Sequence, residues 1–159
     1  MTKQIRIGVA DTMFALGDMG SLAVKTLNAS KKPIRIFRYT VPGIKDLPVA
    51  CKKLFREKKC EVVVALGMVG GEEIDEECAL VADVGLQFAQ VKAGKHIIGV
   101  FVYEREARGN NKKLVEIMRD RTVKHCRNAL DLLFNPRSLA KRAGTGQRQG
   151  GDNAKPIKL

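Results

Sequence analysis

The fold of this chain is decided by one stretch, Glu61-Val62-Val63-Val64-Ala65-Leu66-Gly67-Met68-Val69-Gly70-Gly71-Glu72-Glu73-Ile74-Asp75-Glu76-Glu77-Cys78. Residues 62–66 form an unbroken apolar run rich in valine, which is typical of a short strand buried on both faces. Glycines at positions 67, 70 and 71 then predict a turn, because glycine adopts backbone conformations that other residues avoid. Five carboxylates within six residues follow, at the start of an apolar pattern with helical period. The stretch therefore predicts a strand, a glycine loop and a helix.

A glycine loop in this position has two interpretations. In open α/β sheets, ligands bind at the carboxyl ends of the strands, so the loop is a candidate site. Alternatively, the glycines only make a tight turn, and the acidic residues only complement the positive end of the helix dipole. The spacing within the stretch favours the second interpretation, so the case for a site depends on the other loops.

Three further strands are predicted from alternating or continuous apolar residues, at positions 4–9, 34–40 and 96–103. Helices are predicted at about residues 19–28, after Asp46, at 74–93 and at 112–134. Strands that alternate with helices imply a parallel sheet with right-handed crossovers. We predict a three-layer α/β sandwich whose four-stranded parallel sheet has the flavodoxin-like strand order 2-1-3-4. The loops after strands 1, 2 and 3 are then neighbours.

The helix that follows the acidic run has an apolar stripe at helical spacing. The residues of this stripe are Ile74, Cys78, Val81, Gly85 and Phe88. Cys51 and Cys126 also occupy apolar positions of predicted helices, and the four cysteines include no C-x-x-C pair. This usage predicts reduced, buried thiols and no metal site.

A length of 159 residues fits a single domain. We predict one α/β domain over residues 1–143 and a flexible, basic, glycine-rich tail over residues 144–159. No apolar run approaches the roughly 18 residues of a membrane span, and the first residues contain no signal core. The expected location is therefore the cytoplasm, without a membrane partner.

The net charge of +12 allows a basic nucleic-acid- or anion-binding α/β module as a non-enzyme alternative. Six basic residues against one acidic residue lie between positions 137 and 159. Aromatic residues make up only 5% of the chain, and tryptophan is absent. Because stacking platforms for nucleic acids interleave basic and aromatic residues, this composition does not favour a nucleic-acid partner.

The three loops themselves argue for a particular kind of ligand. They carry no dinucleotide-binding, P-loop or nucleophile-elbow signature. The pair at positions 11 and 12 has an aspartate that could accept a phosphoryl group, but a strand-end cap is the better interpretation, since no second acidic residue adjoins it. The loops offer an aromatic residue at Phe14, the pair Lys45 and Asp46, and glycine-rich backbone. This inventory suits a flat, polar, neutral heterocycle better than a phosphate, which the carboxylates at 72–77 would repel.

Several motifs resemble the lumazine synthase superfamily. The loop at residues 41–48 is similar to its Val-Pro-Gly-x-x-Glu/Asp-x-Pro motif, Phe14 to its stacking aromatic, and residues 66–70 to its Leu-Gly-x-Val loop. Within the superfamily, residues 11–15, 41–53, 66–79 and 143–150 resemble the archaeal-type riboflavin synthase. The resemblance covers nearly the whole chain, with the motifs in order and at matching spacing.

Two departures from lumazine synthase itself are informative. Its longer loop after the third strand carries a catalytic histidine, whereas residues 67–78 here contain none. Its site also needs a phosphate cradle, which the acidic loop does not provide. The resemblance therefore implies riboflavin synthase, which transfers a four-carbon unit between two molecules of 6,7-dimethyl-8-ribityllumazine and yields riboflavin and 5-amino-6-ribitylamino-2,4-pyrimidinedione. Lumazine synthase remains the alternative enzyme.

The resemblance also implies roles for individual residues. It places Phe14 against a ring, the backbone of residues 66–69 at the pyrimidine edge, and Asp46 at the ribityl hydroxyls. The full set of expected substrate contacts is Thr12, Phe14, Ile44, Asp46, Leu66, Gly67, Met68, Val69 and Gly70. The candidates for proton transfer or orientation are Lys45, Glu73 and Asp75. Each of these charged residues has an alternative role as a helix cap or surface charge, and for Asp46 and Asp75 the two interpretations weigh equally.

By resemblance, the sites lie between adjacent subunits of a homopentamer, and Arg148 in the tail is a candidate to close them. No metal or organic cofactor is required for the reaction, although the resemblance leaves room for a stimulating divalent cation such as Mg²⁺.

Overall fold

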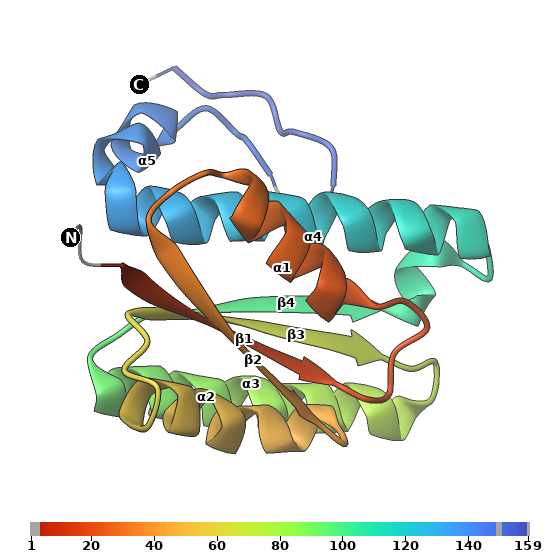
Figure 1. The fold of residues 1–159 in the computed structure, drawn as a ribbon. Coiled ribbons are helices and arrows are strands. Elements are labelled where there is room, and N and C mark those ends of the chain that lie inside the picture. The colour runs from red at the N-terminus through yellow and green to blue at the C-terminus, as the bar shows by residue number, and fades with distance from the viewer. Residues whose placement is uncertain (1–3, 149–150, 159) are drawn as a thin grey trace.

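A computed structural model describes residues 4–148 and 151–158 of the chain. At its centre is a parallel sheet with the strand order β2-β1-β3-β4 (Figure 1). The strands are β1 (Ile5–Thr12), β2 (Ile34–Val41), β3 (Val62–Val69) and β4 (Ile97–Tyr103). Every residue of β3 is buried, as the apolar run at 62–66 predicts. The predicted fold class and strand order are both confirmed.

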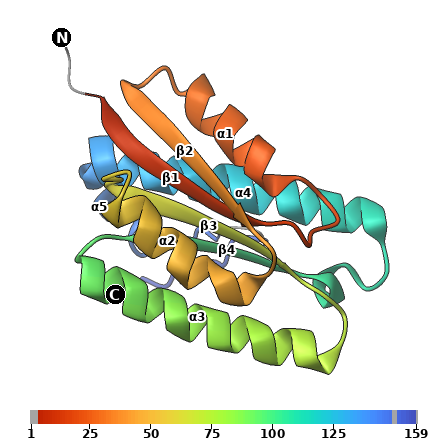
Figure 2. The same ribbon diagram turned by 60° about the horizontal axis from the view of Figure 1, so that its bottom comes forward.

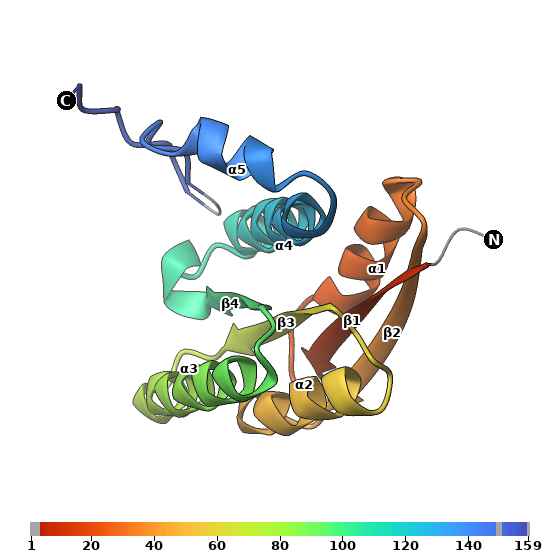
Figure 3. The ribbon, with the colours of Figure 1, turned by 90° about the vertical axis from the view of Figure 1, so that its left-hand side faces the viewer.

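Helices cover both faces of the sheet and complete the three layers (Figure 3). The layer on one face consists of α1 (Met19–Ala29) and α4 (Asn111–Phe134), and α5 (Pro136–Arg142) packs on α4 farther from the sheet (Figure 3). The layer on the other face consists of α2 (Leu47–Arg56) and α3 (Glu73–Ala93), which lie side by side (Figure 2). Two 3-10 helices follow β2 and β4, namely η1 (Ile44–Asp46) and η2 (Glu104–Ala107).

The two central strands supply side chains to a core on each face, because successive residues of a strand point to opposite sides. Val62 and Val64 pack in the core beneath α1 and α4, with Ile7 and Val9 of β1. Val63 and Ala65 pack in the core beneath α2 and α3. Burial on both faces explains why this strand is recognisable in the sequence as a continuous apolar run.

β3 continues past the predicted turn. Gly67 and Met68 belong to the strand and pair with Phe101 and Val102 of β4. A Cβ on Gly67 would lie 2.8 Å from Cγ2 of Ile44 and 2.9 Å from Cε1 of Phe101. The prediction of a turn at residue 67 is therefore wrong. This glycine provides room for packing across the strand. Of the three glycines, only Gly70 and Gly71 belong to the connection between β3 and α3.

β1 and β3 separate near their carboxyl ends. Their pairing stops at Ala10 and Ala65, whereas β1 continues to Thr12 beside β2, and β3 continues to Val69 beside β4. Past Ala65, the edge of β3 that faces β1 no longer makes ladder hydrogen bonds to β1. Chain connections run in opposite directions from this point of the sheet, which is where α/β proteins bind their ligands.

The apolar stripe predicted for α3 does not face the sheet. The side chains that α3 buries are those of Ala79, Ala82 and Leu86. Ile74, Val81 and Phe88 are instead exposed. The buried face thus consists of two alanines and one leucine, while most of the larger apolar residues of the helix point outward. The predicted stripe of this helix is therefore wrong as a description of its packing.

The cysteines follow the prediction with one exception. Cys51 and Cys126 are buried, but Cys78 is only half-buried because it lies on the flank of α3. Burial raises the pKa of Cys51 to about 12 and that of Cys126 to about 12, which keeps both as neutral thiols.

The chain after α5 is exposed over residues 144–148 and 151–158 except at Gly146, which is half-buried. The hydrogen bonds within it are local: Ala154 N–H donates to Gly146 O at 2.8 Å, and Arg148 N–H donates to Oδ1 of Asn153 at 3.0 Å. Positions 149, 150 and 159 of the predicted tail lie outside the described residues. The division into a domain ending at 143 and a flexible tail stays a prediction. No described helix combines the length and the apolar character that crossing a bilayer requires.

Candidate active site

The loops after β1, β2 and β3 meet at the carboxyl end of the sheet (Figure 1). Met13 N–H in the β1–α1 loop donates to Val41 O at the end of β2 at 2.7 Å, and Phe14 N–H donates to Pro42 O at 3.4 Å. On the other side of the loop, Leu16 N–H lies 3.1 Å from the sulfur of Met68 in β3. The β1–α1 loop therefore bridges the two neighbouring loops, as the predicted strand order requires.

Phe14, the predicted stacking residue, is held by its backbone while its side chain remains accessible. The residue is 55% exposed. Its carbonyl accepts a hydrogen bond of 2.9 Å from the hydroxyl of Thr12, a buried residue. A fixed, accessible aromatic ring is suited to stacking on a planar heterocycle. The role of Thr12 visible in one chain is to shape this loop, and its contact with substrate stays a prediction.

The β2–α2 loop carries three predicted residues in η1. Asp46 caps this turn, because its Oδ2 accepts a hydrogen bond of 3.2 Å from Gly43 N–H. Ile44 packs over Gly67. Lys45 is exposed, and within residues 4–148 and 151–158 it forms no hydrogen bond or ion pair. The capping role weighed for Asp46 is thus present, while the Lys45 ammonium is available to a ligand or another chain.

The β3–α3 connection holds the two carboxylate candidates in different environments. Oδ2 of Asp75 accepts a hydrogen bond of 3.1 Å from Glu72 N–H and so caps the start of α3. A Cβ on Gly70 would collide with this carboxylate, so the glycine is required for the cap. Glu73 is exposed and has no hydrogen-bond partner in the described part of the chain. Geometry therefore favours Glu73 over Asp75 as a group free to act on a substrate.

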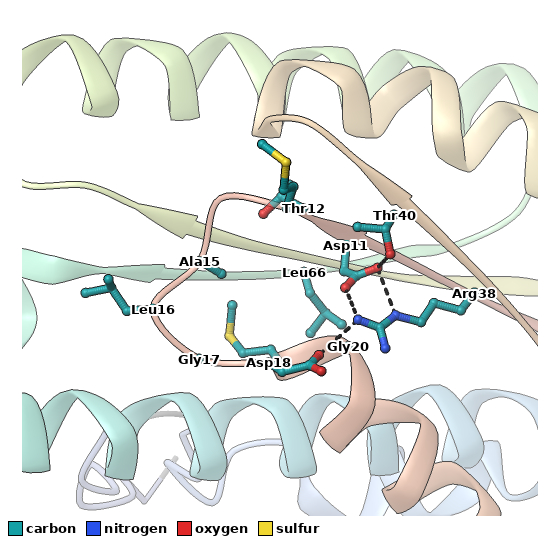
Figure 4. Close-up of a pocket in the computed structure, with 12 residues that line it drawn as sticks. Asp11, Thr12, Ala15, Leu16, Gly17, Asp18, Gly20, Arg38, Thr40 and Leu66 are labelled. Atoms are coloured by element: carbon teal, nitrogen blue, oxygen red, sulfur yellow. Dashed lines mark hydrogen bonds and ion pairs between the residues drawn. The ribbon is translucent and has the colours of Figure 1, made fainter.

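A cavity of about 240 Å³ lies beneath the β1–α1 loop (Figure 4). Its lining includes Thr12 and Leu66 from the predicted set, and also Asp11 and Arg38, which the sequence interpretation did not assign to the site. Arg38 Nη2 donates to Oδ2 of Asp11 at 2.6 Å. The volume is below the roughly 300–1,000 Å³ of typical small-molecule sites, so this cavity does not hold a complete substrate.

The strand ends behind the loops are packed, in contrast to the loops. Leu66, Met68 and Val69 are all buried, and of the three only Leu66 lines the cavity, so a ligand at the gap between β1 and β3 would meet mainly the backbone of this segment. The charged and aromatic candidates lie outside, on the exposed rim of the same edge. The described chain thus presents an open site, which the predicted residues border without enclosing it.

The described residues contain no group of three histidine, cysteine, aspartate or glutamate side chains arranged to hold a metal ion. The use of a divalent cation such as Mg²⁺ stays a prediction.

The sequence model of the 6,7-dimethyl-8-ribityllumazine synthase family matches residues 4–136 of this chain. The chain belongs to this family. It is 46% identical over 153 residues to the riboflavin synthase of Archaeoglobus fulgidus, a match that covers 96% of this chain and 99% of that relative. The riboflavin synthases of Methanothermobacter thermautotrophicus and Aeropyrum pernix are likewise 46% identical over 96% of this chain, and the matches cover 99% and 97% of those proteins.

Membership in the lumazine synthase family confirms the resemblance predicted from the motifs. The family match spans every residue of the candidate site, from Thr12 to Asp75. The relatives also align with the region beyond residue 136, since they cover 96% of the chain.

Gly67→Ala tests whether the β2–α2 loop and β4 depend on close packing against this glycine of β3. The added Cβ would lie 2.8 Å from Ile44 and 2.9 Å from Phe101, closer than side chains approach in folded proteins. We expect a loss of about 1–3 kcal/mol of unfolding free energy, measured by denaturant unfolding, together with a displaced β2–α2 loop. Gly99→Ala is the matched control, because a Cβ there meets nothing within 4 Å. Equal stability of the two variants would contradict this account of Gly67.

Proposed function

We propose that this protein is a riboflavin synthase, which converts two molecules of 6,7-dimethyl-8-ribityllumazine into riboflavin and 5-amino-6-ribitylamino-2,4-pyrimidinedione. The observation that carries the proposal is the function named for its relatives. The proteins from Archaeoglobus, Methanothermobacter and Aeropyrum that match 96% of this chain are riboflavin synthases. The 46% identity extends over nearly the full length of both proteins, so the matched region includes the three loops of the candidate site.

The electrostatics of the open site support the same substrate class. The start of α3 carries the exposed residues Glu72, Glu73 and Glu77, together with Glu76, which is paired with Arg105. Negative charge at this helix end would repel the phosphate ester of a sugar phosphate. It does not oppose a lumazine, whose ring and ribityl chain are uncharged in their ordinary form. The site is therefore better suited to two lumazines than to a lumazine precursor and a sugar phosphate.

The mechanism rests mainly on orientation. The 7-methyl group of the lumazine is acidic for a methyl group, because the ring delocalises the resulting carbanion, so much of the reactivity belongs to the substrate. The protein must hold two like rings face to face and antiparallel. Aligned intramolecular reactions set a scale of roughly 7–11 kcal/mol for such an orientation effect. In this mechanism Phe14 stacks on one ring, and the backbone of residues 66–69 binds the pyrimidine edge at the gap between β1 and β3.

Among the charged residues, we assign proton transfer or orientation to Lys45 and Glu73 ahead of Asp75. Lys45 and Glu73 are exposed and unengaged in the described chain, whereas one oxygen of Asp75 caps α3. Asp46 contacts the ribityl hydroxyls through the carboxylate oxygen that does not bond to Gly43. Ile44 lies beside the ring position, over Gly67.

The open site is completed by a second copy of the chain. α3 exposes a continuous apolar face, to which Ile74, Leu80, Val81, Val84, Phe88 and Val91 contribute. Phe88 is 74% exposed and Val91 is 79% exposed, which is unfavourable for an isolated chain in water. We assign this face to the contact between copies, in a cyclic homopentamer with its active sites between adjacent subunits.

The remaining features of the proposal follow from the same reaction. Electron flow within the two rings needs no organic cofactor, and a divalent cation such as Mg²⁺ would act only as a stimulant. Nucleic acid is not a partner, and the enzyme works in the cytoplasm. Arg148 in the tail is assigned to closing the site of a neighbouring copy.

The test of the proposed function is incubation of the purified protein with 6,7-dimethyl-8-ribityllumazine as the only substrate. We expect riboflavin fluorescence to rise above the uncatalysed rate, with two lumazines consumed for each riboflavin formed. The assay is run with and without Mg²⁺. Absence of riboflavin under both conditions would overturn the proposal.

The second candidate is 6,7-dimethyl-8-ribityllumazine synthase, because the matching family model carries that name. This enzyme would be inactive on the lumazine alone. It would form lumazine only when the pyrimidinedione is supplied with a four-carbon sugar phosphate. Both reactions can be followed on one preparation, so a single experiment separates the two candidates.

A further inference from the structure

A single guanidinium contacts both ends of the β1–α1 loop (Figure 4). Arg38 on β2 donates to Asp11 through Nη2 at 2.6 Å and through Nε at 3.2 Å. The same Nη2 donates to Oδ1 of Asp18 at 2.9 Å. Asp11 is the second-last residue of β1, one residue before the loop, and Asp18 caps the start of α1, immediately after the loop. The arginine therefore links the two points at which the loop leaves and re-enters regular structure.

The polar groups of this network satisfy one another. Oδ1 of Asp11 also accepts a hydrogen bond of 2.8 Å from the hydroxyl of Thr40. Asp18 accepts from the backbone N–H and the hydroxyl of Ser21 at 2.9 and 2.6 Å, and Arg38 Nη1 donates to that hydroxyl at 2.8 Å. Asp11 is only 4% exposed, so its charge requires these partners. Arg38 uses four of its five N–H donors on these partners, and a guanidinium engaged in this way is suited to positioning rather than to binding substrate.

The first turn of α1 is shaped to accommodate this network. A Cβ on Gly20 would collide with Oδ2 of Asp11 and would lie 2.7 Å from Nη2 of Arg38. Alanine is the better helix former, and the backbone of Gly20 is not in the left-handed region. The absence of a side chain at this position therefore serves the contact between Asp11 and Arg38, and not the helix.

The loop between the two anchored ends has little packing of its own. The cavity of about 240 Å³ lies beneath it, and Met13, Phe14 and Leu16 are all exposed. Its position is set by its two ends, by the backbone bonds to Val41 and Pro42, and by two contacts in the middle: Leu16 N–H with the Met68 sulfur, and Ala15 with the core. A loop supported in this way becomes mobile when one anchor is lost.

We propose that Arg38 is a positioning residue, which holds the β1–α1 loop so that the Phe14 ring is in place before substrate binds. This inference rests on the proposed function for the role of Phe14, but the loop position itself can be measured without substrate. If the loop adopts its binding conformation only part of the time, the apparent dissociation constant rises by the inverse of that fraction. The rate at saturating substrate stays the same.

The test compares Arg38→Ala with the wild-type protein in two measurements. The first is amide hydrogen exchange of a peptide covering residues 12–18 in the substrate-free protein, followed by mass spectrometry. We expect exchange in this peptide to accelerate at least about 10-fold. The second is steady-state kinetics with 6,7-dimethyl-8-ribityllumazine, for which we expect KM to rise about 10-fold and kcat to stay within about twofold of the wild type.

Three further variants separate positioning from general destabilisation. Gly20→Ala displaces the pair of Asp11 and Arg38 without removing a charged group, and it carries the test should Arg38→Ala fail to fold. Arg38→Lys offers one ammonium in place of a planar fork, so it should restore KM only in part. Arg35→Ala removes another arginine of β2 that is bonded to neither aspartate, and it should leave both measurements unchanged.

Unchanged exchange in residues 12–18 of Arg38→Ala and Gly20→Ala would overturn the inference. It would also be overturned by equal acceleration throughout the sheet, or by a fall in kcat at constant KM, which would place Arg38 in the chemistry. The exchange measurement is independent of activity. A wild-type protein that forms no riboflavin, but whose loop exchanges faster in the variants, would refute the proposed function and leave the role of Arg38 in holding the loop supported.

Discussion

Phe88→Lys is expected to convert the assembled protein into single chains and to abolish riboflavin formation. Phe88 is 74% exposed on the outer face of α3, among the other apolar residues of that helix. An ammonium group at a contact between copies costs several kcal/mol per copy, because it is removed from water without a partner. About 3 kcal/mol at each contact corresponds to a roughly 100-fold weaker association. Analytical ultracentrifugation over a range of protein concentrations measures this change.

Two control variants make the result specific. Phe88→Leu keeps an apolar side chain and should preserve both assembly and activity. Val115→Lys places the same ammonium on an exposed apolar position of α4, on the opposite face of the sheet, and should leave the assembly intact. An assembly that persists in Phe88→Lys would refute the assignment of the α3 face. A folded single chain with full activity would refute the active site between subunits.

The strand order could be predicted from the sequence because two physical constraints act on it together. Strands that alternate with helices favour parallel pairing, and right-handed crossovers restrict the order. The apolar run at residues 62–66 also requires burial on both faces, as found for β3. The motifs of the three loops are local in sequence, so their meeting at one edge followed directly from the strand order.

The orientation of α3 could not be predicted from spacing. The helix has two apolar surfaces, one formed by Ala79, Ala82 and Leu86 and one of large residues that includes Phe88. Helical periodicity shows that such surfaces exist, but it does not show which one faces the sheet. The surface with more large apolar residues would be expected to face the sheet, and in this helix that expectation is wrong. The surface that contains the two alanines packs against the sheet, and the surface of large residues stays exposed in the described chain.

The contact between Arg38 and Asp11 could not be predicted from the sequence for a different reason. On an edge strand that alternates polar and apolar residues, an arginine looks like a solvent-exposed charge. Its contact with Asp11 depends on the register that places Asp11 opposite Thr40. The available signal was the acidic residue at the end of a buried strand, since a carboxylate in such a place requires a cationic partner on a neighbouring strand. Once β1 is placed beside β2, Arg38 is close enough to be that partner.

Phe14→Ala is expected to lower kcat/KM for the lumazine by about 10- to 100-fold with little change in stability. Stacking of a base on an aromatic side chain contributes roughly 1–3 kcal/mol, and orientation of the two rings is the main contribution of the protein. Because Phe14 is 55% exposed, its removal should change the unfolding free energy by no more than about 0.5 kcal/mol. Steady-state riboflavin formation and thermal unfolding measure the two quantities on the same preparation.

The comparison that identifies stacking uses two variants of the same loop. Phe14→Tyr keeps the ring and should retain most of the activity, whereas Leu16→Ala removes an exposed apolar side chain that is not aromatic and should change kcat/KM less than threefold. If Leu16→Ala and Phe14→Ala lose activity equally, the loop contributes apolar surface rather than a stacking ring. If Phe14→Ala stays within threefold of the wild type, the ring does not bind the lumazine, and substrate orientation must then depend on the backbone of β3 and on the neighbouring copy.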